Sequence, residues 1–403
     1  MIHIEDKRNC VSCANCIQVC PVGCIEFRCD SEGFRYPYGD ANKCIGCSKC
    51  HDVCPVEQHG YLGGNSFVTK AYGAINKNAE IRRQSSSGGL FSAFASEIIN
   101  RNGIVYGASI IDKKVKHISV SNQVDMYKLR RSKYVQSDIL GLFPNIKQTI
   151  SLDRPVLFSG TPCQIKALYC YLGCRPHNLL TIEVVCHGVP SPTVYERYLN
   201  ELGADYMIFR NKDRSWSNYD VEIHYPDESY KIEKASENLY MRGFLHNWFL
   251  RPSCSRCPAK SFLSGADITL GDFWGGQKLA PQLFDDKGTS VVFLHSSKGE
   301  VYWKRIINQI EYQDVPVDDA KKGNSCISYS VVVPSNRDLF FKDLYHSNLL
   351  DVLRYYLNRE QFRQSRINTF CTIIRRLYLR VINLFRQDLI SIFIVYLLLF
   401  VLF

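Results

Sequence analysis

The chain has 403 residues, of which 46% are hydrophobic, and a formal net charge of +10, so it is long enough to bury a sizeable core in two or three domains. Eighteen cysteines and a charged start without the apolar stretch of a secretion signal favour reduced or metal-bound thiols over disulfides. Residues 352–388 contain eight arginines and only two acidic residues, Glu360 and Asp388. Most of the excess positive charge therefore lies in this segment, the net charge of the rest of the chain is small, and nucleic acid is not an expected partner.

Two cysteine runs near the N-terminus share one spacing. CVSCANCIQVCP and CIGCSKCHDVCP both follow C-x2-C-x2-C-x3-C-P, the pattern of bacterial ferredoxins, in which the fourth cysteine of each run binds the neighbouring cluster. The expected ligands are Cys10, Cys13, Cys16 and Cys54 for one 4Fe-4S cluster, and Cys44, Cys47, Cys50 and Cys20 for the other. A zinc domain is the competing interpretation, but it fits two complete four-cysteine runs poorly. Cys24 and Cys29 are left over and are interpreted as buried or incidental thiols.

Beyond about residue 60 the chain alternates between strand and helix patterns. Apolar β-rich runs at 67–75, 103–111, 154–160 and 179–185 are interleaved with helical spacing at 88–100, 162–172 and 191–202,. This order predicts an α/β domain with a mixed sheet and helices on its faces. The last expected strands lie at 266–275 and 290–295, before a more helical end. Loop-like stretches at 61–66, 213–218 and 285–289 are candidate linkers or insertions.

Cysteines also follow two of the expected strands. In FSGTPCQ, Thr161 can cap the next helix and Pro162 suits its first turn, so Cys163 lies where the helix dipole favours a thiolate,. Cys186 of CHGVPSP holds the corresponding place after the next strand. Ligands gather at such strand ends in open α/β sheets.

Farther along, Cys254 and Cys257 of CSRCP are spaced to share one metal centre. Together with the two strand-end cysteines they give four thiolates that could converge. Each cysteine taken alone could instead be an ordinary buried thiol. For the CSRCP pair, a structural zinc site is the stronger alternative interpretation.

The motifs QSSSGGLF, SKYVQSD, GTPCQ, CHGV and CSRCP, followed by ADITLGDFWG, resemble the beta-subunit family of coenzyme F420 hydrogenases and dehydrogenases. The resemblance runs from about residue 63 to about residue 334, and the order of the motifs makes it specific. Members of that family bind FAD and a 4Fe-4S cluster. The resemblance therefore implies Cys163, Cys186, Cys254 and Cys257 as ligands of a third 4Fe-4S cluster, close to the flavin.

The resemblance also directs attention to two possible flavin-binding segments. SSSGG precedes a helix that begins near Leu90, and its glycines and free N–H groups suit a pyrophosphate, although such a stretch alone is more often a plain loop and helix cap,. The expected phosphate-binding residues are Ser86, Ser87, Gly88 and Gly89. In SKYVQS, Lys133 is a candidate charge partner and Tyr134 a candidate stacking surface, against the alternative of an ordinary half-buried strand. No catalytic residue is assigned, including Asp272 and Trp274 of GDFWGG.

The expected cofactors together define an activity. FAD exchanges a hydride in one step and electrons singly, whereas a 4Fe-4S cluster passes one electron at a time. We therefore expect a flavin-dependent oxidoreductase that connects a reduced coenzyme, of the deazaflavin F420 type or a nicotinamide, or another small molecule, through three 4Fe-4S clusters to an external electron carrier protein. The alternative is an electron-transfer adaptor without a substrate of its own.

The C-terminal residues predict contact with a membrane. Apolar residues recur at helical spacing between residues 367 and 385 with arginines mostly on the other face, which indicates a basic amphipathic helix,. The apolar run 389–403 would extend about 22 Å as a helix, less than a hydrocarbon core of about 30 Å. The expected location is the cytosol, attached to the inner face of the cytoplasmic membrane by this tail.

The expected fold class is α/β, or α+β when the small first domain is included. The predicted domains are a two-cluster ferredoxin domain at 1–62, a flavin and iron-sulfur domain with a mixed sheet at 63–345, a basic amphipathic helical segment at 346–388 and a hydrophobic tail at 389–403.

Overall fold

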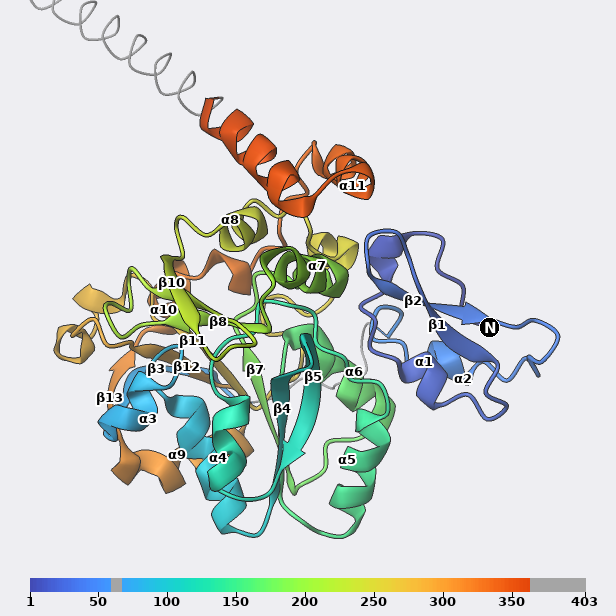
Figure 1. Ribbon diagram of the computed structural model, residues 1–403. Helices are drawn as coiled ribbons and strands as arrows, with labels where there is room; N and C mark the ends of the chain where they lie inside the picture. Colours follow the sequence, from blue (N-terminus) through green and yellow to red (C-terminus); the bar gives the residue numbers. More distant parts are fainter. Residues whose placement is uncertain (59–66, 363–403) are drawn as a thin grey trace, which may run out of the picture. The chain divides into compact units, whose positions relative to one another are not determined.

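The computed structural model describes residues 1–58 and 67–362, and Figure 1 labels its elements. The helices are α1 (Asn15–Gln18), α2 (Lys49–Asp52), α3 (Ala79–Arg83), α4 (Leu90–Asn100), α5 (Leu142–Ser151), α6 (Pro162–Leu172), α7 (Pro192–Leu202), α8 (Leu239–Leu245), α9 (Ser297–Ile306), α10 (Val317–Lys322) and α11 (Arg337–His346). The strands are β1 (Ile25–Cys29), β2 (Arg35–Gly39), β3 (Lys70–Asn76), β4 (Ile104–Ile111), β5 (Lys114–Val120), β6 (Val156–Gly160), β7 (Leu179–Val184), β8 (Tyr206–Asn211), β9 (Asp220–His224), β10 (Tyr230–Lys234), β11 (Ile268–Asp272), β12 (Ser290–Leu294) and β13 (Ile310–Val315).

The N-terminal residues form a small body around a hairpin. Strands β1 and β2 pair antiparallel, and the single-turn helices α1 and α2 each carry part of one cysteine run. Its core is unusually rich in sulfur, because Ile2 and Ile25 pack with buried cysteines of both runs. A body this small has little apolar area to bury, so its stability depends strongly on what those cysteines bind.

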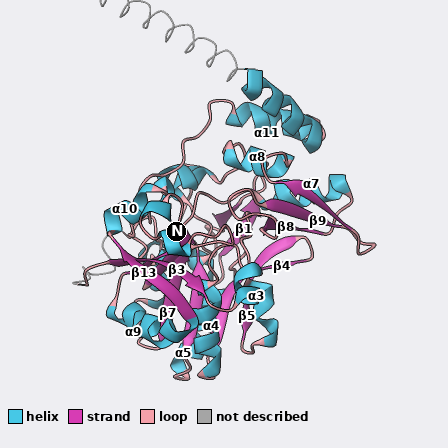
Figure 2. Cartoon of the chain, turned by 90° about the vertical axis from the view of Figure 1, so that its left-hand side faces the viewer, coloured by secondary structure: helices cyan, strands magenta, loops and turns pink. Residues whose placement is uncertain are grey.

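The main body is built on an eight-stranded mixed sheet with the order β13-β3-β12-β11-β7-β6-β4-β5. Its centre is parallel, since β11, β7, β6 and β4 run in one direction, and both flanks are antiparallel. Figure 2 shows these strands within one layer between helices. The α/β fold class expected from the sequence is thereby confirmed.

Alternating residues of the central strands point into two different cores. In β6, Leu157 belongs to the core beneath α4 and α9, whereas Val156 and Phe158 belong to the core beneath α5 and α6. This alternation follows from the two-residue period of a strand, and a sheet covered on both faces explains why β6 and β7 are almost continuously apolar. The carboxyl ends of β6, β7 and β11 therefore open at one edge, where the chain leaves the sheet for Thr161, Val185 and Phe273.

Two parts of the structure depart from the sequence expectation. The strand series does not end at 290–295, because β13 follows and pairs antiparallel with β3 at the sheet edge. Only the two ends of β13 are buried, so its sequence lacks the alternation that reveals a strand. In addition, β8, β9 and β10 form a separate three-stranded antiparallel sheet that the sequence analysis did not identify. The stretch 213–218 is the connection between β8 and β9.

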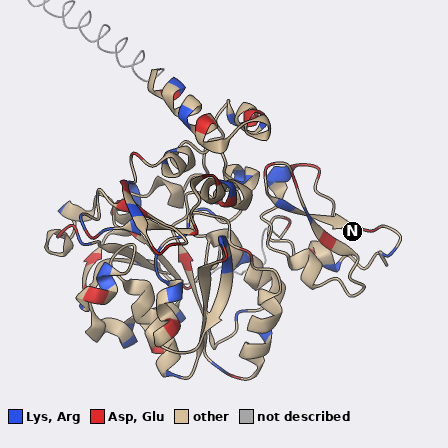
Figure 3. Cartoon of the chain, in the orientation of Figure 1, with Lys and Arg blue, Asp and Glu red and all other residues tan. Residues whose placement is uncertain are grey.

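The chain divides into two compact units, Met1–Leu350 and Asp351–Phe403. In the second unit, residues 351–362 are helical, and the predicted amphipathic helix and hydrophobic tail lie outside the described residues from 363 onward. The candidate linker at 61–66 also lies outside them. Within the described part of the chain, no helix combines the length and the apolar character needed to cross a membrane. Figure 3 colours the basic and acidic residues, which are interspersed over these elements.

Candidate functional site

The two cysteine loops of the N-terminal body repeat one backbone conformation. Ala14 (φ 63°) precedes α1 and Ser48 (φ 58°) precedes α2, and both lie at the same place in their runs. A left-handed conformation costs an L-residue about 1–2 kcal/mol. Such strain persists where the surrounding structure demands it, often at ligand sites. Its recurrence in both runs indicates loops shaped for the same purpose.

Two cavities in this body each collect cysteines from both runs. The first is lined by Cys10, Cys13, Cys16 and Cys54, and the second by Cys20, Cys44, Cys47, Cys50 and the additional Cys24. The grouping is that of the crossed ligand sets, with the fourth cysteine of each run at the other cavity. Cys24 is buried with its Sγ 3.5 Å from that of Cys20, whereas Cys29 is exposed.

The local structure around Cys163 is the one expected from its neighbours. Thr161 is the N-cap of α6, its backbone N–H donates to Gln164 Oε1 (3.0 Å), and Pro162 occupies the first turn. The expected preference for a thiolate does not follow in the free thiol. Burial raises the pKa of Cys163 to about 12, and the neighbouring thiols of Cys257 and Cys254 contribute to the increase.

The remaining cysteines of the third set come from separate elements. Cys186 follows β7, while Cys254 and Cys257 lie in and directly after the 3-10 turn Pro252–Arg256. Burial raises the pKa of Cys254 to about 11 and that of Cys186 well above its ordinary value, with mutual contributions from the neighbouring thiols. All four thiols are partly buried, and a bound metal ion would favour their thiolate forms.

Within residues 1–58 and 67–362, no group of three or more His, Cys, Asp or Glu side chains is arranged so that it could hold a metal ion. The three ligand sets stay predictions. The two ferredoxin sets rest on the cysteine pattern and on their shared cavities, and the third set rests on the family resemblance and on the proximity of its thiols.

The first ferredoxin set lies next to the third cysteine set. Asn15, between Cys13 and Cys16, donates from Nδ2 to the carbonyl of Ala167 in α6 (2.8 Å), the helix that begins beside Cys163. Arg251, at the start of the segment that carries Cys254, donates from Nε to the carbonyl of Cys10 (2.8 Å). One buried and one partly buried hydrogen bond therefore connect the loops of the two sets.

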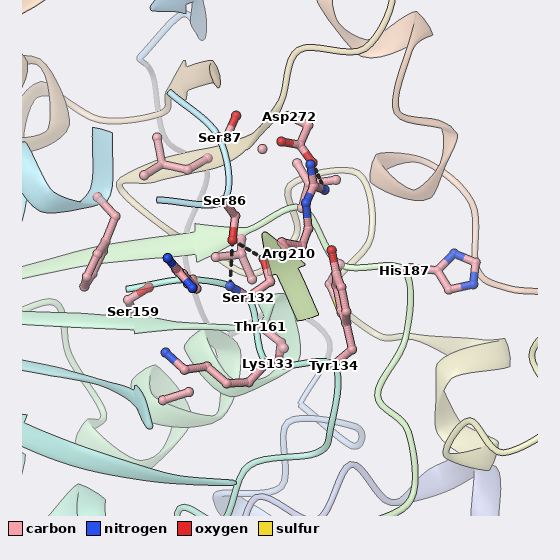
Figure 4. A pocket seen from close by; sticks show the side chains of 18 of the residues that line it. Ser86, Ser87, Ser132, Lys133, Tyr134, Ser159, Thr161, His187, Arg210 and Asp272 are labelled. Atoms are coloured by element: carbon pink, nitrogen blue, oxygen red, sulfur yellow. Dashed lines mark hydrogen bonds and ion pairs between the residues drawn. The ribbon is translucent and has the colours of Figure 1, made fainter. Parts of the chain in front are cut away.

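A cavity of about 520 Å³ opens at the carboxyl ends of the parallel strands (Figure 4). Its lining includes five of the six predicted flavin residues, namely Ser86, Ser87, Gly89, Lys133 and Tyr134. Cys186 of the third set also lines it. The structure thus brings together segments that are up to about a hundred residues apart in the chain, as the strand-end argument requires.

Several of these side chains already have partners in the protein. Ser86 Oγ accepts from the backbone N–H of Ser132 (2.7 Å), which leaves its own O–H available to a ligand. The Lys133 ammonium donates to the carbonyl of Arg130, and burial together with Arg131 lowers its pKa to about 7. One face of the Tyr134 ring stacks on Phe244, with centroids 5.0 Å apart.

Gly88 has a different role from the one expected. It does not line the cavity, and its N–H donates to Ser290 Oγ (2.9 Å). A Cβ at this position would lie 2.5 Å from the carbonyl oxygen of Ala74 and 2.8 Å from the amide nitrogen of Ser290. The glycine is needed for close packing of the turn against β3 and β12, so a bulky substitution would damage the fold rather than report on a ligand.

The sequence analysis left several polar residues of the cavity unassigned. His117 of β5 and Arg210 of β8 line it, and so does Asp272, which the analysis named but did not assign. His117 is buried with its Nε2 2.9 Å from the carbonyl oxygen of Ser159, and burial lowers its pKa to about 4. The sequence feature that could have revealed such residues is a charged or titratable residue within an otherwise apolar strand, as in YMIFRN.

Comparison with known families assigns two regions of the chain. Residues 9–58 match the family described as "4Fe-4S dicluster domain", and residues 153–319 match the family described as the C terminus of the coenzyme F420 hydrogenase/dehydrogenase beta subunit. The chain carries the C-terminal domain of this beta-subunit family. The family domain includes all four cysteines of the third set, whereas Ser86, Lys133 and Tyr134 precede it. The chain is therefore an iron-sulfur protein of an oxidoreductase and electron-transfer family.

Comparison with curated proteins gave no significant match. Among solved structures, one similar chain belongs to the F420-reducing [NiFe] hydrogenase complex from Methanosarcina barkeri. It is 17% identical with a TM-score of 0.44, and the alignment covers 75% of this chain and 94% of the other.

Proposed function

We propose that this chain is a flavin-dependent iron-sulfur oxidoreductase, in which FAD occupies the 520 Å³ cavity and a third 4Fe-4S cluster is held by Cys163, Cys186, Cys254 and Cys257. The observation that carries the proposal is the position of Cys186, which belongs to the third cysteine set and also lines the cavity. A cofactor in the cavity would therefore lie beside the cluster. That proximity is what an exchange of single electrons requires.

The cavity fits a flavin dinucleotide in size and in lining. Its volume is in the range of small-molecule sites, Ser86 supplies a hydroxyl donor, and Tyr134 and Phe244 supply aromatic surface. Bound FAD would supply hydride exchange with a substrate and single-electron exchange with a cluster. The chain's own residues bind and orient the cofactor, and the substrate proposed is a reduced coenzyme of the deazaflavin or nicotinamide type, or another small molecule.

The connections between cysteine sets suggest an order for the electron carriers. The third set contacts the loops of the Cys10 set through Asn15 and Arg251, so the Cys10 set is proposed as the second carrier. The Cys44 set then follows. Its Cys47 is exposed beside Ile45, which is 63% exposed, so an external carrier protein would bind at this end. Electrons can follow the same order in reverse.

Anaerobic purification of the full chain, followed by counts of flavin, iron and sulfide, tests the proposal. We expect about one FAD and about twelve iron atoms per chain, and bleaching of the flavin absorbance by a deazaflavin or nicotinamide donor. A chain that retains its clusters but neither retains nor takes up flavin would contradict the proposal and favour the electron-transfer adaptor. A zinc atom with about eight irons would assign the third cysteine set to zinc.

The sequence of the tail adds a location to the proposal. The apolar run 389–403 after a basic segment suits attachment to the inner face of the cytoplasmic membrane. Fractionation of cells that express the full chain or a chain ending at Asp388 tests this location, and equal partition of both into the soluble fraction would contradict it.

A further inference from the structure

Arg210 is a buried cation with unused hydrogen-bond donors at the cavity. It lies in β8, is 3% exposed, and is among the cavity-lining residues. Its Nη1 donates to Asp272 Oδ2 (2.6 Å), whereas Nε and Nη2 are buried without a hydrogen-bond partner. Leaving a buried charged donor without a hydrogen-bond partner is costly, because the group has lost its water without replacing it. A side chain that keeps two such donors at the wall of a cavity indicates a ligand that accepts from them.

The surrounding residues hold the Arg210 guanidinium in place. Asp272 also accepts from Trp216 Nε1 (3.0 Å), which fixes the carboxylate that anchors Nη1. The guanidinium lies over the ring of Tyr219, 4.1 Å from its centroid, and near that of Trp274 at 5.7 Å. Trp216 and Trp274 stack on each other with centroids 4.5 Å apart. The donors are thus preorganised and lose little freedom when a ligand binds.

The two unpartnered nitrogens form one edge of the guanidinium. Nε and Nη2 lie on the same side of the planar group, so their N–H bonds run parallel as a fork. Such a fork fits two oxygens of one phosphate or carboxylate group and binds them bidentately. The pairing of Asp272 with Nη1 leaves both nitrogens of this edge without a hydrogen-bond partner in the protein. The geometry is therefore selective for an oxyanion.

The charge around the cavity favours a phosphate. Three arginines line the cavity, Arg130, Arg131 and Arg210, together with the amine of Lys133, against the carboxylate of Asp272. Directly after β8, Lys212 donates to the carbonyl of Ser87, so this end of the strand lies against the serine-glycine turn. Helix α4 begins at that turn without a side-chain cap, and its N-terminus adds partial positive charge.

We infer that Arg210, anchored by Asp272, binds a phosphate group of the cavity's ligand through Nε and Nη2. The inference rests on the proposed function for the identity of the whole ligand, and it adds the chemical class of one of its groups. The phosphate can belong to a dinucleotide cofactor or to a phosphate-bearing coenzyme that acts as the substrate. In both cases Arg210 binds a phosphate group. The two cases differ in whether that phosphate belongs to the cofactor or to a second molecule bound beside it.

The test compares the full chain with its Arg210→Lys variant, which keeps a charge for Asp272 but lacks the parallel donors. Isothermal titration calorimetry with inorganic pyrophosphate at constant ionic strength, on flavin-free protein, measures the anion site directly. We expect the dissociation constant to increase roughly ten- to a hundredfold, because one charge-assisted hydrogen bond is lost. The control is Arg214→Lys, whose side chain is half exposed and paired with Asp220, and it should bind pyrophosphate like the unmodified chain.

Two further arms identify the source of the phosphate. If it belongs to the cofactor, Arg210→Lys weakens FAD but not riboflavin, and FAD-loaded protein no longer binds pyrophosphate. If it belongs to a separate substrate, FAD affinity is unchanged and the loaded protein still binds pyrophosphate in an Arg210-dependent way. Equal pyrophosphate affinity of the unmodified chain and Arg210→Lys overturns the inference. Arginine-dependent pyrophosphate binding by a chain that never takes up flavin would support it while contradicting the proposed function.

A double variant guards against a folding defect. Arg210→Met combined with Asp272→Asn removes both charges together and leaves no isolated buried ion. Near-ultraviolet circular dichroism of the Trp216–Trp274 stack reports whether the local structure is retained. A folded double variant should lose pyrophosphate binding, and retained binding would overturn the inference.

Discussion

Replacing Cys163 with alanine is expected to lower the iron content from about twelve to about eight atoms per chain, because one 4Fe-4S cluster loses a ligand while the other two are untouched. The thiol is partly buried at the N-terminus of α6, near those of Cys254 and Cys257. Alanine is preferred to serine, whose hydroxyl can take the place of a ligand. Iron and sulfide analysis of anaerobic protein, with electron paramagnetic resonance of the reduced state, measures the loss.

Cys170→Ala is the matched control for this prediction. Cys170 lies in the same helix, is 3% exposed, and belongs to none of the predicted ligand sets. Its replacement removes a small buried side chain and should leave about twelve iron atoms. If Cys163→Ala keeps the same iron content and resonance spectrum as Cys170→Ala, Cys163 is not a cluster ligand. A loss of iron in both variants would trace the effect to packing of α6.

Local patterns explain what could be predicted from the sequence. The spacing of the two cysteine runs was enough to predict which thiols gather around each cavity of the N-terminal body,. Helix α6 was predicted at its observed limits, 162–172, because Thr161 and Pro162 define its start from within the same segment. The strand-end rule then placed Cys163 and Cys186 on one edge of the sheet.

What escaped prediction depends on contacts between distant segments. Strand β13 is recognisable only through its pairing with β3, since four of its six residues are exposed. The role of Arg210 depends on Asp272, which is 62 residues away, and a charged residue in a strand sequence is ordinarily read as solvent-facing. Gly88 looked like part of a phosphate loop, whereas its glycine character follows from the backbones of β3 and β12.

Replacing Arg251 with methionine is expected to loosen the N-terminal cluster body by roughly 3 kcal/mol, because three partly buried acceptors lose their donor at once,. Arg251 is 2% exposed. Its Nε donates to the carbonyl of Cys10 (2.8 Å), its Nη2 to that of Arg35 (3.1 Å) and its Nη1 to Gln136 Oε1 (3.2 Å). Methionine fills a similar volume but supplies no donor. Hydrogen–deuterium exchange should show faster exchange across residues 9–38, by about a hundredfold.

The same substitution should slow electron transfer between the cavity and the N-terminal clusters, because Arg251 joins the Cys10 loop to the segment that carries Cys254. The control is Arg256→Met in that same segment. Arg256 also reaches the N-terminal body, through an ion pair with Asp6 at 3.6 Å, but its side chain is 58% exposed, and exposed pairs contribute about 0–1 kcal/mol. Equal exchange rates in the two variants would show that the hydrogen bonds of Arg251 do not hold the cluster body in place. If the N-terminal clusters of Arg251→Met are reduced at an unchanged rate, the contacts of Arg251 are not needed for electron transfer to them.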